Sequence, residues 1–134
     1  RITVTELDEE QICLIYSMIS EMTKKALNSL MHSKKTEELY ERLMTQGLLG
    51  EVQPAEAMCD LVENEYIKRL LRNASDSYIR FALSTGRHKE EIKEERNKLT
   101  ELLKNGELKK AEKALDAYFK LLAKAVNEER GMNE

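Results

Sequence analysis

The chain of 134 residues has little that would break a helix: one proline and five glycines. Alternation of Val, Ile and Thr with a period of two, the pattern of a half-buried strand, is confined to residues 1–5. No apolar run approaches the ~20 residues that a membrane span needs, and no signal peptide is recognisable. Strands are therefore nearly excluded and no membrane segment is predicted. Because the first residue is Arg1, we expect the chain to be a piece of a longer protein.

A large excess of charge of one sign is also lacking. The 22 basic and 25 acidic residues give a net charge of −3. The densest basic sites are pairs among acids: Lys24-Lys25, Lys34-Lys35 and Lys109-Lys110. Neutralising phosphates requires clustered Lys and Arg side chains. Direct binding of nucleic acid by this chain is therefore disfavoured.

Catalytic and redox motifs are scarce. The sequence has no glycine-rich phosphate loop, no HExxH and no Ser or Cys near a His in a usable pattern. His32 and His88 fall near expected helix ends, where a solvated side chain is favoured. Cys13 and Cys59 lie far apart in helical apolar patterns. Buried reduced thiols of a cytoplasmic protein are favoured, and a disulfide between them is the alternative. No enzymatic activity is predicted.

What the sequence does contain is apolar residues at three-and-four spacing, with 41% hydrophobic and 35% charged residues. Connections are short, so we predict a single all-α domain over residues 1–134, an antiparallel bundle of about six helices. The expected helices run from Thr5 to His32, Thr36 to Gln46, Pro54 to Val62, Tyr66 to Thr85, Lys89 to Asn105 and Glu107 to Glu129. The apolar stripe expected on the fourth is Ile67, Leu70, Ala74, Tyr78 and Phe81.

The expected helix ends follow from capping chemistry. Thr5, followed by Asp8 and Glu9, is expected to cap the first helix in a variant of the capping box, and Thr36 to cap the second. The other expected boundaries are a turn bracketed by Gly47 and Gly50, a break at Asn64, helix stops at Gly86 and Gly106, and fraying from Gly131 onward.

Two polar residues interrupt the inward stripes of the last two helices. Arg96 lies at inward spacing between Ile92 and Leu99. It either extends along the edge of the stripe or points into a polar pocket, where its fork suits a carboxylate or phosphate. Tyr118 shares a face with Leu115 and is either a core tyrosine with a satisfied hydroxyl or part of the same pocket.

A second group of polar residues flanks the apolar stripe of the fourth helix. It consists of Asn73, Ser77 and Arg80. Their spacing places them together along one side of the helix. They form either its solvent edge or the rim of a pocket.

Four segments, in order, resemble one known family. They are residues 5–12 (TELDEEQI), 62–67 (VENEYI), 78–80 (YIR) and 102–111 (LLKNGELKKA). Together they resemble the FCD domain, the all-helical effector-binding domain of the FadR subfamily of GntR transcription regulators. The resemblance covers nearly the whole chain. It implies a cytoplasmic, bacterial ligand-sensing domain that forms a homodimer, and a winged-helix DNA-binding domain that is absent from this chain.

The departures from that family concern its metal site. FCD domains typically bind a divalent metal through an Asp, a His four residues later and a His on each of the last two helices. The matching positions hold Glu51, Ala55, Arg96 and Tyr118, and Ile19 stands where the family often has a ligand-gripping Arg. Because these residues lack convergent lone-pair donors, no metal or other cofactor is expected.

By the same resemblance, the pocket is expected to take a small anionic effector. The residues expected to bind it are Arg96, Tyr118, Glu51, Arg80, Ser77 and Asn73. Pairing of Glu51 with Arg96 would instead close the site. The alternative function is therefore a helical protein–protein interaction and dimerisation module without a small-molecule site.

Overall fold

The structure, a computed structural model, describes residues 7–47 and 50–133. Its helices are α1 (Glu9–His32), α2 (Thr36–Leu43), α3 (Pro54–Cys59), α4 (Glu65–Ala74), α5 (Arg80–Ser84), α6 (Lys89–Lys104) and α7 (Leu108–Asn133). A π-helical segment, Ser75–Ile79, joins α4 to α5. Counted with that segment as one interrupted helix, the described ranges form six helices, so the all-α prediction is confirmed.

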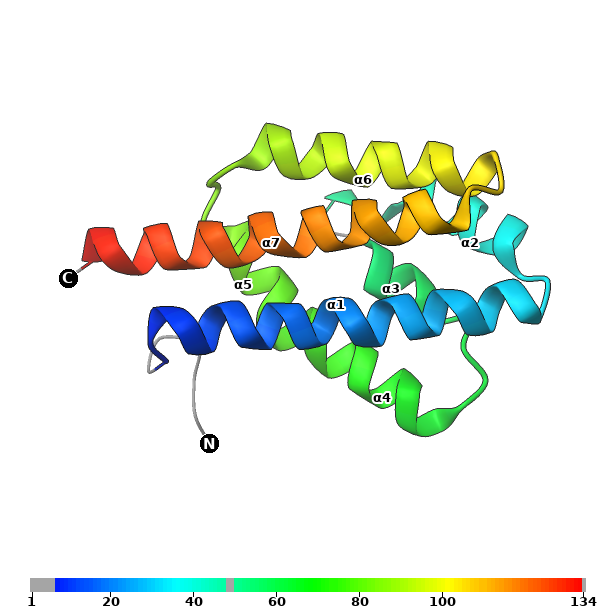
Figure 1. Ribbon diagram of the computed structural model, residues 1–134, viewed down its shortest axis with the longest axis horizontal. Helices are drawn as coiled ribbons and strands as arrows, with labels where there is room; N and C mark the ends of the chain where they lie inside the picture. Colours follow the sequence, from blue (N-terminus) through cyan, green and yellow to red (C-terminus); the bar gives the residue numbers. More distant parts are fainter. Residues whose placement is uncertain (1–6, 48–49, 134) are drawn as a thin grey trace.

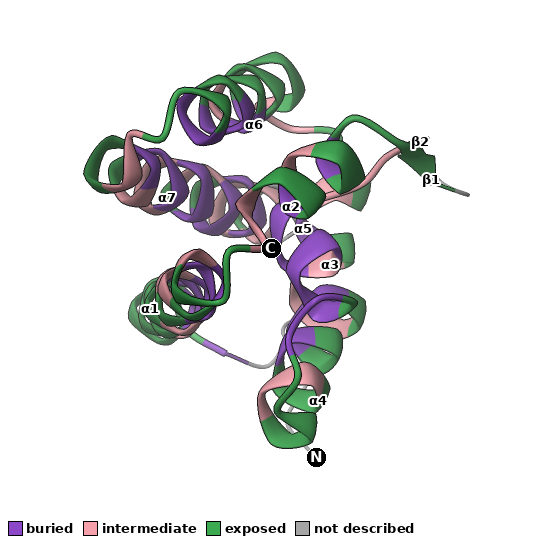
Figure 2. Ribbon diagram, turned by 90° about the vertical axis from the view of Figure 1, so that its right-hand side faces the viewer, coloured by how far each residue is buried: buried purple, intermediate pink, exposed green. Residues whose placement is uncertain are grey.

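The three longest helices form a row with α7 in the middle, antiparallel to α1 and to α6 (Figure 1). The shorter helices α2 to α5 pack along one side of this row (Figure 2). The middle position explains why α7 supplies so much of the core. Its fully buried side chains include Leu115, Tyr118, Leu122, Ala125 and Val126.

The turn between α6 and α7 follows the prediction at Gly106. Its φ of 72° lies in the left-handed region that glycine adopts without strain. The amide of Glu107 donates to the Leu102 carbonyl at 2.9 Å, and the amide of Gly106 donates to the Leu103 carbonyl at 3.2 Å. This is the Schellman pattern, and it closes α6 tightly enough for α7 to return antiparallel.

The first helix is capped by Asp8 and not by Thr5, which lies outside the described residues. The Asp8 carboxylate accepts from the Gln11 amide at 2.8 Å, and the Gln11 side chain accepts from the Asp8 amide at 2.9 Å. Each side chain thus satisfies a backbone donor at the start of the helix. The expected capping box exists, but three residues later than predicted.

The prediction that Thr36 caps the second helix is wrong, because Thr36 is already its first residue and Lys35 is the N-cap. The reason is the end of α1. Lys34 has φ 58°, and the Lys35 amide donates to the Leu30 carbonyl at 2.9 Å. This Schellman closure uses Lys35 itself, so α2 begins at the next residue with no linker.

Other boundaries differ less. Asn64 is the N-cap of α4 and accepts from the amides of Tyr66 and Ile67, so the predicted break is confirmed. At the predicted turn, β1 (Gln46–Gly47) pairs antiparallel with β2 (Gly50–Glu51), so that Gly47 lies opposite Gly50. The structure places Gly131 within α7, which continues to Asn133, so the fraying expected there is not observed.

The apolar stripe expected along the fourth helix is wrong at Leu70, which is 54% exposed. Leu71 and Ile79 are buried instead. The π-helical segment has a wider turn than an α-helix, so the faces before and after it do not share one phase. A prediction that assumes 3.6 residues per turn throughout therefore assigns the wrong buried face to part of this helix.

Both cysteine thiols are free in the part of the chain that the structure describes. Cys59 is buried, as expected, but Cys13 is exposed, so that part of the prediction is wrong. Its neighbour Ile12 takes the inward position on α1 and directs Cys13 away from the core. None of the described helices is long and apolar enough to cross a membrane.

Candidate functional site

Arg96 points into the protein and is only 4% exposed. Its Nε and Nη2 atoms donate to the Val52 carbonyl at 3.0 and 2.8 Å, and Nη2 also donates to the Leu43 carbonyl. Leu43 is the last residue of α2, where carbonyls lack partners within the helix. The guanidinium therefore closes the end of α2 and holds the segment after β2 against α6.

The third nitrogen of the Arg96 fork is less engaged. Nη1 lies 3.6 Å from the Glu51 carboxylate and 3.4 Å from the Asn97 side-chain oxygen. Both distances exceed those of a strong charge-assisted hydrogen bond. Glu51 is half-buried, so its charge compensates the buried cation without a short bond. The expected Glu51–Arg96 pairing is present, but it is secondary to the carbonyl bonds.

Tyr118 is fully buried and donates its hydroxyl to the Gln53 side-chain oxygen at 2.6 Å. The Gln53 side chain in turn donates to the Glu51 carbonyl at 3.0 Å. Burial raises the pKa of Tyr118 far above its ordinary value, although the nearby positive charge of Arg96 opposes the shift. The phenol therefore stays protonated and acts as a donor.

Glu51, Gln53, Arg96 and Tyr118 together form what we call the polar core cluster. Its members come from β2 and the segment after it, from α6 and from α7. Arg96 and Tyr118 hold neighbouring residues of that segment, Val52 and Gln53. The cluster thus fixes one short segment to two helices.

The remaining predicted site residues lie elsewhere. Arg80 is half-exposed on α5, 3.7 Å from Glu56 of α3 and 3.6 Å from Asp76. Ser77 is half-buried in the π-helical segment and Asn73 is exposed on α4. Among the described residues, none of these three forms a hydrogen bond or ion pair with Arg96 or Tyr118. Ala55, which the sequence resemblance matched to a metal position, is fully buried in α3.

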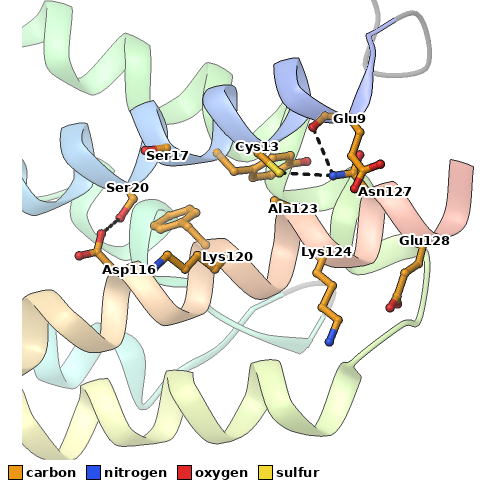
Figure 3. A pocket seen from close by; sticks show the side chains of 12 residues that line it. Glu9, Cys13, Ser17, Ser20, Asp116, Lys120, Ala123, Lys124, Asn127 and Glu128 are labelled. Carbon is orange, nitrogen blue, oxygen red and sulfur yellow. Dashed lines mark hydrogen bonds between the residues drawn. The ribbon is translucent and has the colours of Figure 1, made fainter. Parts of the chain in front are cut away.

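A groove of about 660 Å³ lies between α1 and α7 (Figure 3). Ser20 donates to Asp116 at 2.6 Å across one end, and Asn127 donates to the Glu9 carbonyl at 3.4 Å across the other. None of the predicted site residues lines this groove. Burial disfavours the ionised Asp116, but hydrogen bonds from Ser20 and Lys24 outweigh it and lower the pKa of that carboxyl.

His88 was expected in solvent, but its ring is held between two acids. It lies 3.2 Å from Glu91 and 2.5 Å from Glu128 of α7. Hydrogen bonds to Glu91 and then to Glu128 raise the pKa of His88. Arg87 beside it donates to Glu129 at 2.8 Å. These contacts attach the turn before α6 to the far end of α7.

Sequence reasoning missed Gln53 and the two carbonyl acceptors of Arg96. Gln53 precedes Pro54 at a helix start, where its side chain gives no periodic pattern. Across the described ranges, no three His, Cys, Asp or Glu side chains gather as a group that could hold a metal ion. In comparisons with known proteins, no family model, no curated protein and no solved structure matches this chain.

Proposed function

We propose that this chain is the ligand-sensing and dimerisation domain of a cytoplasmic, bacterial transcription regulator of the GntR type. The single observation that supports this most is the polar core cluster. Glu51, Arg96 and Tyr118 come from three separate elements, yet they converge around one short segment. The resemblance to the FCD family matches these same three positions to its metal site. DNA would be bound by a winged-helix domain outside this chain.

The proposed effector is a small organic or phosphorylated anion that binds at Nη1 of Arg96. That nitrogen has only long contacts, to Glu51 and Asn97. A ligand carboxylate would compete with the Glu51 carboxylate for this position, since both are acceptors of the same charge. Tyr118 is committed to Gln53 and would contribute indirectly, by holding the segment next to the anion.

Binding of such a ligand would change the conformation of a neighbouring segment. Displacing Glu51 from Arg96 would move the segment that leads from β2 into α3. An effector switches a regulator only if it binds one arrangement more tightly than the other. The proposed switch is therefore between a closed arrangement, with Glu51 at Arg96, and an open one with the anion there.

One observation favours a second candidate, a helical dimerisation module without an effector. Nε and Nη2 of Arg96 and the hydroxyl of Tyr118 are all satisfied by acceptors of the chain itself. A buried guanidinium satisfied in this way stabilises the fold and needs no ligand. In that case the cluster is structural and the protein acts through its surface alone.

Thermal unfolding with added anions separates the two candidates. We expect citrate, succinate or phosphate to raise the melting temperature of the parent, and to raise it further in Glu51→Gln, which removes the competing charge. Arg96→Met, which keeps the side-chain length, should lose the effect. Lys98→Met, at an exposed position of the same helix, should keep it. At 100 times the dissociation constant an anion stabilises by about 2.7 kcal/mol, which is readily measured. No shift in the parent or in Glu51→Gln would reject the effector site.

A further inference from the structure

Four large apolar side chains are exposed on two neighbouring helices. They are Leu14 and Met18 of α1, 60% and 62% exposed, and Tyr66 and Leu70 of α4, 76% and 54% exposed. A groove of about 410 Å³ lies between these helices, with Met22 and Ile67 on its walls beside the charged residues Glu21 and Lys25. We call the six apolar residues the α1/α4 face. Both helices lie along one edge of the molecule in the end view (Figure 2).

We propose that the α1/α4 face is a twofold-symmetric interface that binds a second copy of this chain, with Met18 on the symmetry axis. The proposal makes the dimerisation part of the proposed function specific and does not depend on any effector. Large apolar side chains exposed together on neighbouring helices mark an interaction surface. In a twofold interface the same face must be complementary to itself.

The spacing along α1 meets that requirement. Leu14, Met18 and Met22 recur every four residues and form one stripe along the helix. If two copies of α1 cross antiparallel at Met18, each Leu14 lies opposite the Met22 of the other copy, and the two Met18 side chains meet. A crossing centred on Leu14 would instead place Met18 opposite Glu10, an apolar side chain against a charge. The crossing at Met18 is therefore the favoured register.

The charges at the ends of the stripe argue for the same occupant. Glu10 and Lys25 are exposed, and neither forms an ion pair within the described part of the chain. They lie on either side of Met18 at nearly equal distances, with about 22 Å of helix between them. Antiparallel crossing at Met18 brings Lys25 of each copy beside Glu10 of the other. The face thus carries opposite charges that a second copy would pair.

Cysteine cross-linking tests the position of the axis. In a Cys13→Ser background, Met18→Cys should form an intermolecular disulfide under mild oxidation. Helices 8–10 Å apart bring Cα atoms on the axis within disulfide range. Met44→Cys is the matched control, because Met44 is 61% exposed but lies outside the face. A Met18→Cys dimer band without a Met44→Cys band supports the proposal. Equal cross-linking of both, or none at Met18, overturns it.

Sedimentation equilibrium tests the energetics without oxidation. Met18→Glu should raise the dimer dissociation constant more than about tenfold, and Met44→Glu should leave it unchanged. Lys25→Glu should weaken the dimer a few-fold, and adding Glu10→Lys should restore it. A dimer insensitive to Met18→Glu would place the interface elsewhere, which overturns this face while dimerisation stands. A parent that stays monomeric at high micromolar concentration would overturn both, and the anion titration would still test the effector site separately.

Discussion

Replacing Arg96 by Met should destabilise the protein, although it removes a buried charge. The variant leaves the Leu43 and Val52 carbonyls without their donor. A buried polar group without a partner costs about 1–3 kcal/mol; the Leu43 carbonyl is buried and Val52 is half-buried, so the two together cost at most about 2–6 kcal/mol. The guanidinium no longer has to be desolvated, which offsets part of this cost, and Met fills a similar volume. We expect a net loss of about 2–4 kcal/mol in the free energy of unfolding.

Urea denaturation followed by helical circular dichroism measures this loss. Unfolding entropy scales with length, and for a chain of this size about 3 kcal/mol corresponds to a melting temperature lower by roughly 10 °C. Arg96→Lys should recover only part of the stability, because one ammonium lacks the planar fork that reaches Val52 through two nitrogens. Equal or greater stability of Arg96→Met would refute the reasoning, since the carbonyl bonds would then contribute nothing net.

Three further outcomes follow from single contacts. His88 has φ 54°, and His88→Asn keeps a residue that tolerates this left-handed backbone conformation. Because the pKa of His88 is raised, its stabilisation is complete below about pH 6.5 and is lost as the pH rises through the raised pKa. Melting temperatures of parent and variant should therefore differ at mildly acidic pH and converge at alkaline pH. Tyr118→Phe frees the half-buried Gln53 oxygen and should cost about 1 kcal/mol in urea denaturation. Asp8→Ala removes the capping box and should also cost about 1 kcal/mol by the same assay, with little change in helix content.

The position of Arg96 was predictable and its partners were not. The three-and-four spacing of apolar residues is a local property, so it places Arg96 and Tyr118 on inward faces from the sequence alone. The acceptors are backbone carbonyls 44 and 53 residues away from Arg96. Every residue has the same backbone carbonyl, so the amino acids at positions 43 and 52 give no indication of the contact with Arg96.

The presence of the helices and most of their boundaries were predictable because they also depend on local sequence. Asn64 and Gly106 act through their own backbone conformation or side chain, and both end or begin helices as expected. The prediction for Thr36 was wrong because the end of the preceding helix decides where α2 starts. That end begins with Lys34 in a left-handed conformation. The predicted solvent environment of His88 was wrong because its partner Glu128 lies 40 residues away, and only the packing of the helices brings the two side chains together.

The π-helical segment contains one residue more than a regular α-helix would need between α4 and α5. In a regular α-helix the eight positions from Leu71 to Ile79 would turn the two side chains about 80° apart. The wider turn of residues 75–79 absorbs one residue, so both side chains are buried. Deleting one residue there would yield a regular helix in which Leu71 and Ile79 lie seven positions apart and still share one face, so α4 and α5 would keep their phase. A single deletion should therefore be tolerated within residues 75–79, for example at the exposed Asp76, whereas a further insertion would rotate α4 out of phase with α5.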